Sequence, residues 1–255
     1  QERALERARA ARDAECEAQA WSGLADVLYA DGRLRSAYAA FNGCVVLCDR
    51  EGLTRFSLNN RCMLAIVHAY LEPADAAVPE LDRVRAAARD LRQRSAEVMA
   101  DETEGWVRVS QGRDEDAIAP AERSLALARE IGSRRWVVFN LAILAYAFWN
   151  VGRRAEAVAA LREGFAVGAE TGLRFVGGML HGARALMVED AHQLASVLAD
   201  GEASLATGCP AHSHFWYRRE AIDAALRHAD WDRALLEAGA LEAFTRAEPV
   251  PWIDF

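Results

Sequence analysis

The stretch that decides the fold is WSGLADVLYADGRLRSAYAAF, which covers residues 21–41. Apolar side chains recur in it at intervals of three and four on both sides of Gly32, so two amphipathic helices joined by a short turn are expected. Gly32 ends the first helix, because glycine adopts the left-handed backbone of a helix end at little cost. Ala25 is small enough to let the second helix come close, and Ala37 and Phe41 face back across the pair.

Small residues recur along the chain at a fixed interval. Alanine occupies positions 37, 77, 117 and 157, which are 40 residues apart. Gly32, Gly112 and Gly152 follow the same interval, with Glu72 in the remaining position. A period in this range indicates a solenoid, in which each repeat packs on its neighbours. The sequence therefore predicts an all-α fold, a right-handed α-solenoid with a period of about 40 residues.

The spacing in residues 21–41 resembles the tetratricopeptide repeat, whose pattern is W-x2-L-G-x2-Y, then a turn glycine, then A-x3-F. The resemblance implies about six helix-turn-helix units within a single domain of residues 1–255. The expected units are approximately 14–52, 55–93, 96–132, 134–172, 174–206 and 213–247. Two turns depart from the pattern: Glu72-Pro73-Ala74 closes the second unit's first helix, and Ala229 replaces glycine in the sixth.

Composition excludes several classes of partner. The chain has 255 residues and a formal net charge of −8, with acidic and basic residues interspersed. Without a basic stripe, no nucleic-acid partner is expected. No apolar run approaches the roughly 18 residues of a membrane span, so no membrane partner is expected either. The five cysteines lack zinc-ribbon spacing and no signal peptide is recognisable, which favours small core residues in a reducing cytoplasm.

In tetratricopeptide arrays the first helix of each unit lines a concave face. If the register holds, the candidates for binding a partner on this face are Tyr29, Tyr70, Trp106, Tyr146, Trp149, Asn150, Trp216, Arg219 and Asp223. Aromatic side chains repeated along a groove suit an apolar or helical peptide segment. The alternative is that these aromatics pack between adjacent repeats and belong to the core.

The tightest group of metal-type ligands is Cys209, His212 and His214, in a segment expected to be a loop at a helix start. Three such ligands could bind zinc, but no fourth is evident. A local role in hydrogen bonding is favoured, and no metal or cofactor is expected.

Carboxylate pairs such as Asp114 with Asp116 fall in turns, where they favour helix starts. No nucleotide-binding or hydrolase motif is present, so the chain is not expected to be an enzyme.

Longer stretches carry a closer resemblance. They are residues 34–48, 122–132, 212–222 and 229–232, together with the tail LEAFTRAEPVPWIDF at 241–255. They resemble the C-terminal repeat region of bacterial signalling proteins that carry an adenylate/guanylate cyclase domain and an AAA-type ATPase domain. The resemblance implies a sensor or partner-binding arm, and it transfers no catalytic residue to this chain. The start at Gln1 within a helical pattern and the end at Phe255 suggest a fragment of a longer protein.

These observations lead to one main functional hypothesis and two alternatives. The main hypothesis is a non-catalytic regulatory scaffold that binds a protein or peptide segment in its concave groove, with the parent protein's own catalytic module as one possible partner. A small-molecule sensor enclosing an effector near Trp106, Tyr146 and Trp149 is the second. A stand-alone adaptor is the third.

Overall fold

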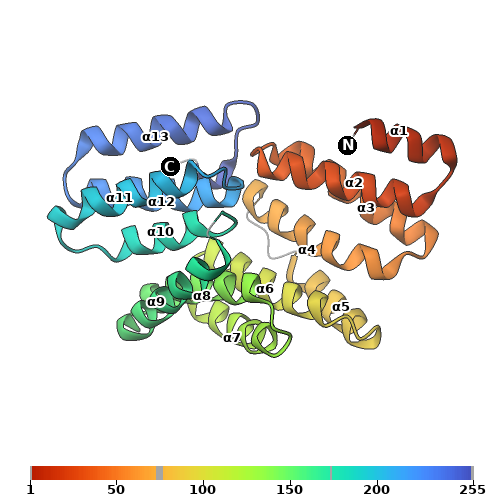
Figure 1. The fold of residues 1–255 in the computed structure, drawn as a ribbon, viewed down its shortest axis with the longest axis horizontal. Helices are drawn as coiled ribbons and strands as arrows, with labels where there is room; N and C mark the ends of the chain where they lie inside the picture. Colours follow the sequence, from red (N-terminus) through yellow and green to blue (C-terminus); the bar gives the residue numbers. More distant parts are fainter. Residues whose placement is uncertain (1, 73–76, 173, 254–255) are drawn as a thin grey trace.

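The computed structural model describes residues 2–72, 77–172 and 174–253. These residues form thirteen α-helices and one short 3-10 helix (Figure 1). The elements are α1 (Glu2–Ala11), α2 (Ala14–Ala30), α3 (Leu34–Glu51), α4 (Thr54–Leu71), α5 (Ala77–Asp90), α6 (Arg94–Ser110), α7 (Asp114–Glu130), α8 (Arg134–Asn150), α9 (Arg154–Thr171), α10 (Gly177–Met187), α11 (Ala191–Leu205), α12 (Ala211–Arg227), α13 (Trp231–Thr245) and η1 (Pro251–Ile253).

The helices pack as six consecutive pairs, from α2 with α3 to α12 with α13, and α1 lies against α2. The first helix of each pair also contacts the first helix of the next, through α2, α4, α6, α8, α10 and α12. The series closes, because α12 returns to touch α2 (Figure 1). The solenoid is therefore a ring, and we call the side formed by these six first helices the inner face.

Turn residues with left-handed backbone separate the helices of several pairs. Gly32, Gly112 and Gly152 have φ values of 76°, 71° and 84°, which explains why glycine recurs at this position. Ala229 adopts φ 56° in the sixth unit. The turn geometry is thus kept there, at a cost of roughly 1 kcal/mol for a residue with a Cβ. The second turn leaves α4 through Glu72 in extended backbone; Pro73 and Ala74 lie outside the described residues.

Small residues mark the closest helix contacts. Ala25, Ala37, Ala117 and Ala157 are each 0% exposed. A Cβ added to Gly105 of α6 would lie 3.3 Å from Cβ of Ala121 on α7. Larger side chains at such positions would force the helices apart. The repeated small residues therefore mark the places where one helix packs closely on the next.

Helix starts are capped unevenly. Asp13, Asp190 and Asp230 each accept a hydrogen bond from a backbone amide of the helix that follows them, α2, α11 and α13. At the start of α3, Arg33 makes no side-chain capping bond. The first amides of a helix have no partner within the helix and pair with water or with groups from elsewhere. The same absence of a side-chain cap is found at α4, α6, α7, α8, α9, α10 and α12. Among the described helices, none is long and apolar enough to cross a membrane.

Candidate binding face inside the ring

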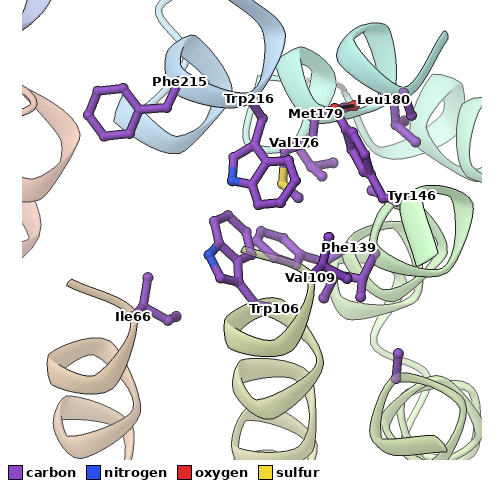
Figure 2. Close-up of a cluster of buried hydrophobic side chains, with 14 of the residues drawn as sticks. Ile66, Trp106, Val109, Phe139, Tyr146, Val176, Met179, Leu180, Phe215 and Trp216 are labelled. Atoms are coloured by element: carbon purple, nitrogen blue, oxygen red, sulfur yellow. Dashed lines mark hydrogen bonds between the residues drawn. The ribbon is translucent and has the colours of Figure 1, made fainter. Parts of the chain in front are cut away.

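Aromatic side chains from four of the first helices meet at the centre of the inner face. Figure 2 shows the indoles of Trp106 from α6 and Trp216 from α12 facing one another. Their ring centroids are 5.6 Å apart, and Trp106 also stacks on Phe139 of α8 at 4.9 Å. Tyr70 of α4 approaches Trp106 edge-on at 6.1 Å. Edge-to-face and offset stacks of this kind stabilise aromatic clusters.

The structure brings five of the candidate groove residues together and buries them. Tyr29, Tyr70, Trp106, Tyr146 and Trp216 are 6%, 1%, 1%, 1% and 3% exposed. The sequence suggested a row of aromatics along an open groove. Closure of the ring instead places α12 across from α6, so that Trp216 fills the space beside Trp106. In this arrangement the five side chains form the inner core of the ring.

The other four candidates lie at the edge of this core. Trp149 is half-buried beneath the Arg154 guanidinium, 3.7 Å from its ring. Exposed Asn150 donates from Nδ2 to Oδ1 of Asp114 at 3.1 Å. Arg219 and Asp223 of α12 are half-buried. These polar groups and Trp149 remain accessible in part, whereas the five inner aromatics do not.

His212 lies in the first turn of α12, which begins at Ala211 rather than after the expected loop. Its Nε2 lies 2.7 Å from the carbonyl of Phe175, which can only accept, so Nε2 carries the proton. Its Nδ1 then accepts from the hydroxyl of Tyr29 at 2.9 Å. Burial lowers the pKa of His212 to about 3, so the ring is neutral. Both ring nitrogens therefore hold protein partners.

The remaining two metal-ligand candidates make separate contacts. His214 stacks on Phe244 with centroids 4.2 Å apart, and burial lowers its pKa to about 4. Cys209 donates from Sγ to the carbonyl of Ser204. Within the described ranges, no three His, Cys, Asp or Glu side chains are grouped to hold a metal ion.

Two carboxyl groups on the inner face have no hydrogen-bond or ion-pair partner among the residues that the structure describes. Glu102 of α6 is 4% exposed and Glu220 of α12 is 8% exposed. Within the described part of the chain, neither makes a hydrogen bond or ion pair. Burial raises the pKa of Glu102 to about 8, with the Arg135 guanidinium opposing the shift. Burial, helped by the Asp223 carboxylate, raises the pKa of Glu220 to about 7.

Other buried charges are paired, which sets these two apart. Arg85 of α5 donates to Asp101 of α6 at 2.9 Å. Arg218 of α12 donates to Glu237 of α13 at 2.5 Å. Both carboxyls keep a slight contact with solvent, since neither has an oxygen that is both fully buried and unpartnered. A carboxyl so largely removed from water without a partner still costs free energy.

A tail after α13, residues 246–253, crosses to the other end of the array. Glu248 accepts from the backbone amide of Ser36 at 3.0 Å and also from its hydroxyl. Trp252 donates from Nε1 to the carbonyl of Ser110 at 2.9 Å. Val250 and Ile253 are buried. The tail therefore links the sixth pair to α3 and α6.

A solved structure has the same arrangement of helices: the crystal structure of a Rap protein complexed with competence and sporulation factor. The TM-score is 0.74 and the sequence identity is 16%, over 91% of this chain and 64% of that chain. The chain is an α-solenoid of tetratricopeptide-like repeats. It spans 64% of the length of the structure it matches, and at this identity the likeness shows the fold alone. No protein-family model and no curated protein matches the sequence.

Sequence reasoning missed both unpartnered carboxyls, although a signal was present. Glu102 precedes Trp106 by four residues, and Glu220 follows Trp216 by four. Residues four apart share a helix face, so each carboxyl lies one turn from a candidate groove tryptophan. The tail contacts carried no such signal, because they join segments more than a hundred residues apart.

Proposed function

We propose that the ring is a non-catalytic regulatory scaffold that recognises a protein or peptide segment at its inner face. The observation that carries the proposal is the pair of unpartnered carboxyls, Glu102 and Glu220, beside an aromatic cluster. A peptide backbone supplies N–H donors and C=O acceptors, and a carboxyl group can accept or, when protonated, donate. A bound segment would therefore satisfy both groups, while its apolar side chains contact the aromatics.

Access to this face requires the ring to open between α2 and α12. The two ends of the array are joined there by the hydrogen bond of Tyr29 to His212, by the bond from Nε1 of Trp216 to the hydroxyl of Tyr70 at 2.8 Å, and by the tail. Conformational change on binding is common among regulatory interactions. The structurally similar Rap protein was solved in complex with competence and sporulation factor. That complex is in keeping with a binding role for the fold, and the same role is proposed for this chain.

The kind of protein to which this chain belongs is proposed from the resemblance of its tail. Residues 212–222 and 241–255 resemble repeat regions of bacterial signalling proteins that carry cyclase and ATPase domains. We therefore propose a cytoplasmic, bacterial signal-transduction arm whose partner is the parent's own catalytic module or a separate protein. An immunoblot of the source cells, followed by peptide mapping of the band, tests this. A band much larger than 28.0 kDa with cyclase peptides is expected, and a band of about that size would contradict it.

A library of random peptides displayed on phage, selected on the full chain, tests the binding role. Selected peptides are then made synthetically and titrated calorimetrically. Glu102→Ala and Glu220→Ala should each weaken binding by roughly tenfold, the effect of losing one hydrogen bond to a carboxyl. Glu122→Ala on the exposed side of α7 is the matched control and should bind normally. Equal affinity for all three variants would rule out the inner face.

Trp149→Ala gives an independent check. Because Trp149 is half-buried at the edge of the inner face, its loss should weaken binding more than folding. If this variant unfolds instead, Trp149 belongs to the core.

A small-molecule sensor is the alternative, at a different place from the one expected near Trp106, Tyr146 and Trp149, because Trp106 and Tyr146 are buried. A cleft of about 510 Å³ between the start of α2 and the junction of α3 with α4 favours it; Glu15, Gln19, Arg55, Phe56 and Leu91 contribute to its lining. Its volume lies in the range of small-ligand sites. Binding of a metabolite that is lost in Phe56→Ala and kept in Glu102→Ala would select the sensor over the segment-binding scaffold.

A further inference from the structure

The carboxylate of Glu248 occupies a helix start that has no cap of its own. Arg33 precedes α3 and makes no side-chain capping bond. Glu248 accepts from the Ser36 amide in the first turn of α3 at 3.0 Å, and the Nε of Arg33 lies 3.5 Å from it. Amides and positive partial charge at a helix start favour an anion. Partial burial opposes ionisation, but the bonds from Ser36 lower the pKa of Glu248 below its usual range.

The indole of Trp252 occupies the end of another helix. Its Nε1 donates to the carbonyl of Ser110, the last residue of α6. Carbonyls in the last turn lack a partner within the helix. Its ring meets Tyr70 edge-on at 5.3 Å and Trp216 at 5.1 Å. The Arg219 guanidinium lies 4.6 Å from the same ring.

The tail is thus a short segment that ends in the 3-10 helix η1 and has a short connection to the rest of the protein. Glu248 and Trp252, four residues apart, make its polar contacts, and Val250 and Ile253 are buried. Only Arg246 and Ala247 separate Glu248 from the end of α13. Pro249 and Pro251 are exposed, and Trp252 is only half-buried. Both anchors recognise main-chain groups and aromatic faces, which any segment with the same two side chains could use. We call the surface beneath the tail, formed by Arg33, Ser36, Tyr70, Ser110, Trp216 and Arg219, the tail site.

We infer that the tail site is a docking site for a partner segment that carries a carboxylate and, four residues later, an indole, and that this segment displaces the chain's own tail. The inference rests on the proposed function and names the chemistry of the segment. The tail joins the start of α3 to the sixth helix pair, so its displacement removes one link between the first and the sixth pairs. The docked segment then contacts both Tyr70 of α4 and Trp216 of α12, as the chain's own tail does.

The test uses the full chain with both anchors removed, Glu248→Gln with Trp252→Ala, and a synthetic peptide of residues 246–253, acetylated and amidated. The peptide should bind the double variant and raise its melting temperature. It should bind the wild type at least about tenfold more weakly, because the tethered tail competes. The same peptide with Trp252→Ala should lose about tenfold or more in affinity for the double variant, as aromatic anchors usually do.

The inference would be overturned if the intact peptide and the Trp252→Ala peptide bound the double variant with equal affinity. It would also be overturned if the intact peptide bound the wild type and the double variant equally well. If circular dichroism shows that the double variant is unfolded, Glu248→Gln alone replaces it and the same comparisons decide. Library peptides selected on the inner face separate the two proposals. If they bind but the tail peptide neither binds nor competes with them, the docking inference fails and the scaffold function stands.

Discussion

Glu248 accepts a hydrogen bond from the backbone amide of Ser36, a residue 212 positions earlier in the chain. The pair joins the segment after the last long helix to the start of α3, in the first helix pair. Trp252 adds a second long-range bond, to the carbonyl of Ser110. Together with the hydrogen bond of Tyr29 to His212, these contacts hold the solenoid closed.

Glu248→Gln should destabilise the protein at neutral pH by about 1–2 kcal/mol, the usual value of a charged helix cap. The folded-state pKa of Glu248 lies below its usual value of 4.5. Its contribution is therefore present above that value and disappears as the pH falls through the folded pKa. Urea unfolding of wild type and variant should differ at pH 7 and coincide in strong acid. If the unfolding free energies of wild type and variant differed by the same amount at all pH values, the ionised carboxylate of Glu248 would not be the stabilising group.

Glu102→Gln should have the opposite pH dependence. The carboxyl of Glu102 has a pKa of about 8 in the folded protein and 4.5 ordinarily. The unfolded chain loses this proton first, so folding is progressively disfavoured as the pH rises from 4.5 to 8. The variant lacks that loss and should gain stability relative to the wild type across this interval. Melting temperatures in mildly acidic and mildly alkaline buffer, with Glu122→Gln as control, measure the gain.

Ala117→Leu should destabilise by about 1–3 kcal/mol, because it overpacks a close contact between helices. Ala117 is 0% exposed, and its carbonyl lies 3.4 Å from the position of a Cβ on Gly105. Ala119→Leu, at an exposed position of the same helix, is the matched control and should change stability little. An unchanged melting temperature for Ala117→Leu would show that the repeated small residues do not set the helix spacing.

Gly201→Ala and Gly239→Ala should act in opposite directions. A Cβ on Gly201 of α11 would overlap the ring of Tyr217, whose hydroxyl is held by the carbonyl of Leu198. This variant should therefore lose stability. Gly239 of α13 has no atom within 4 Å of an added Cβ, so alanine there should stabilise the helix by roughly 0.5–1 kcal/mol. Denaturant midpoints of both variants provide the measurement.

The sequence allowed the helical repeats to be predicted, because their signals are local or recur between neighbours. Gly32 and Ala37 suit a place where one helix turns back on another, so residues of the same kind appear again at Gly152 and Ala157. Closure of the ring has no such signature. The contacts of Tyr29 with His212 and of Glu248 with Ser36 each occur once, between segments remote in sequence. The inner aromatics were therefore expected along an open groove, whereas closure buries them.

The contact between α2 and α12 changes how this array unfolds. In an open solenoid the terminal repeats have one neighbour each and fray first, so melting proceeds inward from the ends. Here every helix pair has a neighbour on both sides, and no pair is an obvious starting point. Unfolding of any one helix pair also breaks the series of contacts that closes the ring. The described array should then melt as one cooperative unit, and a ligand bound to any pair should protect all six.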